Sequence, residues 1–298
     1  GSFYSWSSPL VISMLTIGGL SLIIFVVVEK RLANLPMIPL HLFTMRKSLT
    51  FLLSQNFFFG MCYYSSLYYY PFYFEIVRGE HVITTSLYLL CLVIPQSFTS
   101  IVTGQIISRS KHYIHVIWFG YILWTLAVGL TIIWGVKKNL AVCIVTLILN
   151  GLGVGATFQP TLVGAQSQSY KKDRAIVIST RNVLRSFGGA VGLAVSSNLV
   201  SNSYSKLLQE KGSSAFSQEE MDILKHQIFS TINLEKFSPS QILLLRNIFM
   251  QSLRYVFYFW IASMSYCLIT TITVKDRGLV GIEEELAKEH VKSRVVQS

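Results

Sequence analysis

Two arginines stand four residues apart, Arg181 and Arg185, in an otherwise apolar part of the chain. This spacing places both on one face of a helix, with Arg181 near enough to the segment's end for its side chain to reach water. Arg185 lies about ten residues in, ~15 Å by the helical rise, where a guanidinium normally faces a bundle interior or a wet cavity. Arg185 is therefore the leading candidate for a substrate-path or gating residue. The alternative is a structural arginine held by helix carbonyls.

Gln159 is the second candidate, because Pro160 follows it and a proline leaves a helix carbonyl free to accept a hydrogen bond. It precedes the same short loop that Arg185 follows, so the two residues are predicted to lie at similar depth. The Gln159 amide or the freed carbonyl would then hold the Arg185 guanidinium. The remaining candidates for the substrate path are amides inside other apolar segments: Gln55, Asn56, Gln96 and Asn150.

Glycines indicate where helices approach one another. Gly188 and Gly192 form the GxxxG pattern typical of helix contacts in membranes, and we expect them to be helix-packing positions. Gly151, Gly153 and Gly155 share the spacing of a dinucleotide loop, but no strand precedes them and the segment is apolar. The same packing role is predicted for these three.

Tyrosines crowd the segment between Ser48 and Phe74. The deeper ones could line an aromatic cavity suited to organic cations, whereas the outermost ones would form a belt at the membrane surface. The tyrosines concerned are Tyr63, Tyr64, Tyr68, Tyr69, Tyr70 and Tyr73.

Several classes of function are excluded by what the sequence lacks. The enzyme motifs HExxH, GxSxG and GxxxxGK[ST] are absent, and no carboxylate stands at the middle of an apolar segment. The four cysteines lack the spacing of a metal site. Basic residues interleaved with aromatics on a soluble face, which RNA binding needs, are also absent. We expect no enzyme activity, no cofactor, no metal and no nucleic acid partner.

Composition places the chain among polytopic membrane proteins, with 52% hydrophobic and 13% charged residues and a mean hydropathy of +0.51. A span needs ~20 mostly apolar residues, and without the period-2 alternation of a barrel it must be a helix. The sequence predicts an all-α membrane helix bundle of about seven transmembrane helices: Leu10–Val28, Ser48–Phe74, Val82–Ile107, Ile114–Trp134, Leu140–Val163, Ala175–Val200 and Ile248–Val274.

Lysine and arginine gather after the first, third and fifth spans and in the tail. By the positive-inside rule the C-terminus is cytoplasmic and the amino end lies outside or in a lumen. The net charge of +11 then reflects topology and anionic lipid. Residues 201–247 are predicted to be an outer loop with short amphipathic helices, one starting after Ser217 and one after Ser238.

Several motifs resemble one family. The segment from Tyr69 to Gly79 resembles the YYxPxYFQ…G pattern, with Glu75 where glutamine is usual. The segment from Phe187 to Leu199 is similar to lGxxxGxavxGxl, with Ser197 in place of its last glycine. The run from Gly151 to Pro160 and the opening Tyr4-Ser5-Trp6-Ser7-Ser8-Pro9 are similar as well. Together they resemble the carboxyl-terminal half of fungal drug:proton antiporters of the fourteen-span class, in the major facilitator superfamily.

The resemblance implies three parts: residues 1–47 as a linker transmembrane helix with a cytoplasmic connection, 48–274 as a six-helix bundle, and 275–298 as a cytoplasmic tail. It implies a transporter fragment that exports drugs or toxic organic cations by alternating access, driven by protons, in a plasma or vacuolar membrane. The partners would be a small-molecule substrate, protons, the lipid bilayer and a missing N-terminal half. That half would carry the proton-coupling residue.

Two alternatives stay open. A vacuolar basic amino acid transporter of the same family uses the same machine on a different substrate. A seven-span receptor is favoured by topology alone, although no Asp/Glu-Arg-Tyr follows the third span and no Asn-Pro-x-x-Tyr occurs in the last.

Overall fold

The computed structural model of the protein describes residues 7–31, 42–43, 46–137, 139–213, 215–226, 228, 237–276 and 278–279. Within these ranges every regular element is helical, which confirms the all-α prediction. The α-helices are α1 Pro9–Arg31, α3 Lys47–Phe72, α4 Val82–Ser110, α5 Ile114–Leu130, α6 Leu140–Ser167, α7 Arg174–Gly212, α8 Gln218–His226 and α9 Pro239–Thr271. Short π- or 3-10 turns extend them at Tyr73–Val77, Thr131–Ile133 and Lys171–Asp173.

Five helices in the described part of the chain are long and apolar enough to cross a membrane: Pro9–Glu29, Val82–Ser110, Ile114–Ile133, Leu140–Ser167 and Lys171–Gly212. The sequence predicted seven. The two others, α3 and α9, are of spanning length but carry more polar side chains, some of which face neighbouring helices. Gln55 in α3 and Ser252 in α9 are both fully buried in this way.

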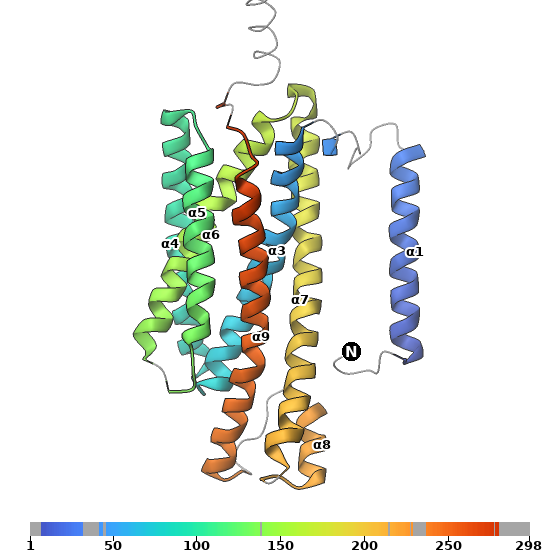
Figure 1. Cartoon of the computed structure of the whole chain (residues 1–298), viewed down its shortest axis with the longest axis vertical. Coiled ribbons are helices and arrows are strands. Elements are labelled where there is room, and N and C mark those ends of the chain that lie inside the picture. Colours follow the sequence, from blue (N-terminus) through green and yellow to red (C-terminus); the bar gives the residue numbers. More distant parts are fainter. Residues whose placement is uncertain are drawn as a thin grey trace, which may run out of the picture.

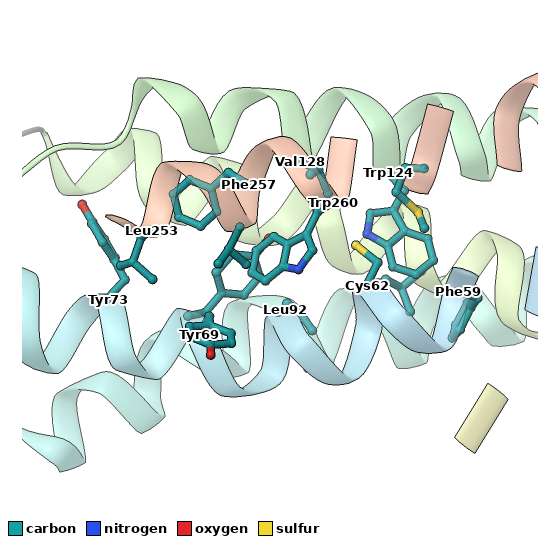
Figure 2. Packing of buried hydrophobic residues seen from close by; sticks show 14 of the residues in the cluster. Phe59, Cys62, Tyr69, Tyr73, Leu92, Trp124, Val128, Leu253, Phe257 and Trp260 are labelled. Carbon is teal, nitrogen blue, oxygen red and sulfur yellow. The ribbon is translucent and has the colours of Figure 1, made fainter. Parts of the chain in front are cut away.

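Six helices run side by side as one bundle, with α1 standing apart from them (Figure 1). The closest pairs are α3 with α7, α4 with α6 and α5 with α6, while α9 packs on α3, α5 and α7. The interior is filled by large aromatic side chains of α3, α5 and α9, among them Phe59, Trp124 and Trp260 (Figure 2). Figure 2 shows Trp124 beside Phe59, with their ring centroids 4.8 Å apart.

Glycines allow the backbones of paired helices to touch. A Cβ at Gly151 would collide with the Leu92 carbonyl of α4, and one at Gly153 would lie 2.6 Å from the Trp124 nitrogen of α5. On the other side of the bundle, Gly188 lies against the Phe57 backbone of α3. One turn further along α7, a Cβ at Gly192 would come within 2.5 Å of the Met61 Cα. The GxxxG of α7 therefore lies on α3.

The predicted outer loop 201–247 is wrong in extent, because residues 201–212 and 239–247 belong to helices. α7 continues to Gly212 and α9 already begins at Pro239, so both project beyond the other helices with α8 beside them (Figure 1). Hydropathy did not signal these ends because they are polar. The two predicted helix starts are confirmed: α8 begins after Ser217, and Ser238 forms a capping box with Gln241.

α8 is amphipathic and covers this projecting end. Its inward residues Met221 and Leu224 are 5% and 1% exposed, whereas Ile223 is half exposed. Hydrogen bonds tie the extension together, from Lys211 Nζ to Gln251 Oε1 at 2.6 Å and from Gln241 Nε2 to the Ala215 carbonyl at 2.7 Å. The extension is thus a packed helical cap.

The opposite end of the bundle is closed by the segment that follows α9. The Asp276 carboxylate accepts a hydrogen bond from the Ile114 N–H at 3.3 Å, at the start of α5, and lies 3.2 Å from His112 Nδ1. The Lys275 carbonyl accepts from Gln168 Nε2 of α6 at 2.9 Å, and the Lys275 N–H donates to Ser48 Oγ of α3 at 3.2 Å. We call residues 274–276 the tail clasp.

Candidate functional site

The two arginines of α7 share one aromatic ring. The Arg185 guanidinium carbon lies 4.6 Å from the centroid of the Phe158 ring of α6, and that of Arg181 lies 5.2 Å from it. A cation over a ring face is attracted by the ring's quadrupole, most strongly away from water. Phe158 therefore positions both charges at the α6–α7 contact.

Arg181, not Arg185, is the arginine that helix carbonyls hold. It is 2% exposed, and its Nη2 donates to the Phe158 carbonyl and, at 3.4 Å, to Thr161 Oγ1. The expectation that Arg181 reaches out to water is therefore wrong. Arg181 is close to the end of α7 but is buried nevertheless, because α6 covers this part of α7 and supplies the hydrogen-bond acceptors.

Arg185 is half-buried and less satisfied. Its Nε and Nη1 atoms are buried and have no hydrogen-bond partner in the described part of the chain. Neither Arg185 nor Arg181 forms an ion pair with a carboxylate among these residues. Arg185 thus presents hydrogen-bond donors and a positive charge that no side chain of the described part neutralises.

The predicted contact between Gln159 and Arg185 is absent from the described structure. Gln159 is exposed, and its neighbour Phe158 faces the arginines instead. Consecutive helix residues point about 100° apart, so only one of the two can face α7. The acceptor on α6 is the Phe158 carbonyl, which bonds Arg181.

From Phe158 a chain of rings leads across the bundle to α3 and α4. Phe158 and Phe59 have centroids 5.8 Å apart, and Phe59 and Tyr63 are 5.6 Å apart. Gln96 of α4 donates from Nε2 to the Tyr63 hydroxyl at 3.2 Å, while its Oε1 is buried without a partner in the described chain. Gln96 and Arg185 thus belong to one connected cluster that spans α3, α4, α6 and α7.

The other three amides lie inside helix contacts. Gln55 Nε2 reaches α9 at the Cys267 carbonyl, Thr270 Oγ1 and Thr271 Oγ1, at 3.1, 3.0 and 3.1 Å. Asn56 donates to the Leu52 carbonyl of its own helix at 2.7 Å. Asn150 of α6 donates to the Tyr70 hydroxyl of α3. All three amides are fully buried, and no hydrogen bond among the described residues joins them to the arginine cluster.

Three of the six tyrosines do not line a cavity. Tyr69, Tyr70 and Tyr73 are fully buried, and they pack on Trp260 and Trp134 with centroids 4.6 to 6.5 Å apart (Figure 2 shows Tyr69, Tyr73 and Trp260). The interpretation of these three as cavity wall or surface belt is wrong, because Trp260 of α9 and Trp134, which follows the turn after α5, cover them. Tyr63 and Tyr64 remain half-buried.

Sequence reasoning missed two members of the site. Phe158 was passed over in favour of its polar neighbour, since an apolar side chain carries no signal of its own. Arg174 is one of the basic residues that follow the fifth predicted span, and it stands seven residues before Arg181, on the same helix face. Its Nε is buried and has no partner among the described residues.

Membrane-length helices packed into one bundle, with buried amides and arginines at their contacts, define an integral membrane protein. The chain matches the sequence model of the Major Facilitator Superfamily over residues 1–193. It belongs to this superfamily, and since the superfamily consists of transporters, the chain is not an enzyme. The receptor alternative is set aside for the same reason.

Among the proteins that are similar to this chain are three named fungal transporters. Citrate exporter 1 of Yarrowia lipolytica is 40% identical over 288 residues, 97% of this chain and 42% of the relative. Efflux pump dotC of Dothistroma septosporum is 31% identical over 72% of this chain and 37% of its own length. The vacuolar membrane amino acid uptake transporter fnx2 of Schizosaccharomyces pombe is 26% identical over 94% and 48%. The chain thus spans less than half the length of these relatives.

Proposed function

We propose that this chain is the carboxyl-terminal half of a proton-coupled exporter of small organic anions that works by alternating access. The Arg185–Phe158–Arg181 arrangement carries the proposal. Two guanidiniums lie on one ring, neither is paired with a carboxylate in the described residues, and Arg185 keeps unfilled donors. Buried positive charge of this kind is stabilised by an anion, and a carboxylate fits the guanidinium fork in bidentate fashion.

The relatives support this choice of substrate class. Citrate exporter 1 is the relative of highest identity given above, and its name specifies a carboxylate and the direction of transport. The missing N-terminal half and the proton-coupling residue within it belong to the same proposal. The proposal also includes the division into linker helix 1–47, bundle 48–274 and tail 275–298. It places the substrate site at the membrane midplane, between two bundles that rock against each other.

Export of drugs or toxic organic cations is the second candidate, as the resemblance implied. Half-buried Tyr63 and Tyr64, with centroids 5.4 Å apart, favour it, since aromatic faces attract cations. The efflux pump among the relatives agrees with it. Against it, ring contacts join Tyr63 through Phe59 to Phe158, and the two arginines on the Phe158 ring would repel a cation. Transport of basic amino acids into a vacuole, the third candidate, is supported by the fnx2 relative and meets the same repulsion.

The membrane and the orientation are also proposals. We place the protein in a plasma or vacuolar membrane, with the amino end outside or lumenal and the tail clasp on the cytoplasmic side. Anions would then enter from the cytoplasm at the end of α7 that carries Arg174.

The deciding experiment substitutes Arg185 in the full-length transporter that we propose contains this chain. Arg185→Ala should abolish efflux of labelled citrate while leaving membrane abundance unchanged, and Arg185→Lys should only weaken efflux, since Lys keeps the charge but loses the fork. Loss of the protein from the membrane in step with activity would make Arg185 structural. Efflux of a cationic dye without any carboxylate efflux would support the second candidate.

A further inference from the structure

Three arginines follow one face of α7. Arg174, Arg181 and Arg185 are separated by seven and then four residues, so their side chains leave the helix within about 40° of one another. Each has a buried Nε without a hydrogen-bond partner in the described part of the chain. We call these three residues the basic stripe. It starts at Arg174, the first residue of α7, and ends at Arg185, whose guanidinium lies over the Phe158 ring of α6.

The stripe carries more positive charge than one carboxylate would neutralise. Arg181 is fixed to α6 through the Phe158 carbonyl and Thr161, and at 2% exposure it has no surface for a substrate to touch. Arg185 is the half-buried member with free donors. Their spacing of one helical turn brings two like charges together where water screens them poorly.

A bound anion would therefore interact with two positive charges, one by direct contact and the other by its electrostatic field. Arg185 contacts it, and Arg181 acts through space from one turn away. A single negative charge is satisfied by the first guanidinium. A second negative charge on the same molecule gains from the field of Arg181, which no carboxylate of the described part cancels.

We propose that the basic stripe makes this site selective for carboxylates with two or more negative charges over those with one, with Arg181 as the residue that sets the preference without touching the substrate. This inference rests on the proposed function and specifies the substrate class for the same site. Arg174, at the end of α7 nearest the tail clasp, is the member of the basic stripe that an approaching polyanion meets first.

The test compares lactate, succinate and citrate as mono-, di- and tricarboxylate in the full-length transporter, near pH ~7.5, where their carboxyl groups are ionised. Efflux is expressed as a ratio between substrates within one variant, so that membrane abundance cancels. The unaltered protein should prefer succinate and citrate to lactate. Arg181→Gln removes the charge but keeps an amide donor for the Phe158 carbonyl, and it should lower that ratio roughly tenfold.

Two further variants control the result. Arg181→Lys keeps the charge and should keep the ratio, whereas Arg109→Gln removes an exposed arginine at the end of α4, off the stripe, and should leave the ratio unchanged. Equal transport of lactate and succinate by the unaltered protein would overturn the inference, even if Arg181→Gln failed to reach the membrane. So would an unchanged ratio in Arg181→Gln. Absence of transport for all three carboxylates would instead overturn the proposed function.

Discussion

Gly60 of α3 lies directly against the main-chain carbonyl of Arg185, so closely that a Cβ at position 60 would overlap the carbonyl oxygen. The backbone that carries the candidate site is therefore held by a residue with no side chain. Gly60→Ala should push α7 away from α3 and cost about 1–3 kcal/mol through overpacking. Transport should fall as well, because Arg185 would move relative to Phe158. Thermal unfolding of the detergent-solubilised full-length protein and an efflux assay measure the two effects.

Matched controls for this change lie in neighbouring helices. A Cβ at Gly104 of α4 or at Gly129 of α5 would meet nothing within 4 Å. Gly104→Ala and Gly129→Ala should therefore be neutral or stabilise by about 0.5–1 kcal/mol, as an alanine does in an exposed helix position. Equal destabilisation by all three substitutions would show that the α3–α7 contact has no special role.

Gln55 and Gln159 separate a structural amide from an exposed one. Gln55→Leu removes the hydrogen bonds to α9 and leaves the Thr270 and Thr271 hydroxyls without this partner, so it should lower stability by about 1 kcal/mol. Its ratio of citrate to lactate efflux should not change. Gln159→Leu, at an exposed position, should leave the melting temperature unchanged. If Gln55→Leu were as stable as the unaltered protein, the contact between α3 and α9 would be stabilised by their aromatic side chains and not by the Gln55 hydrogen bonds.

The starts of α8 and α9 could be predicted from the sequence, whereas the ends of α7 and α9 could not. Ser217 and Ser238 accept hydrogen bonds from residues three positions away, and such short-range contacts can be read from the sequence. The extension of α7 past Val200 is held by α8 and α9, which are distant in the sequence. Hydropathy locates the part of a helix that lies in lipid, but it contains no information about polar turns beyond the membrane.

The same difference between local and long-range contacts explains why only part of the candidate site could be predicted from the sequence. The depth of Arg185 follows from its position in an apolar segment. Which of Phe158 and Gln159 faces it depends on how α6 is rotated about its axis, and Gly151, Gly153 and Gly155 set that rotation through close contact with α4 and α5. Such contacts join residues far apart in the sequence, so a single chain gives no signal of them.

The tail clasp should contribute measurably to stability. Asp276 accepts a hydrogen bond at the amino end of α5, where a negative charge also interacts favourably with the helix dipole, and it accepts another from the Gly278 N–H at 2.8 Å. Asp276→Ala should lower stability by about 1 kcal/mol. Asp222→Ala is the control, because its ion pair with Lys225 is largely exposed and should contribute little. Identical melting temperatures for both variants would mean that the clasp does not stabilise the bundle.

The two ends of the bundle should differ in their access to reagents. In a full-length protein from which the native cysteines have been removed, Glu219→Cys at the exposed face of α8 should react with a membrane-impermeant maleimide in sealed cells, if α8 lies outside as we propose. Arg109→Cys, exposed at the far end of α4, should react only after the cells are opened. Both positions are exposed on helix surfaces, and we place them on opposite sides of the membrane. The comparison therefore reports membrane topology rather than burial. Labelling of Arg109→Cys but not Glu219→Cys in sealed cells would invert the orientation, and the basic stripe would then open toward the outside or the lumen.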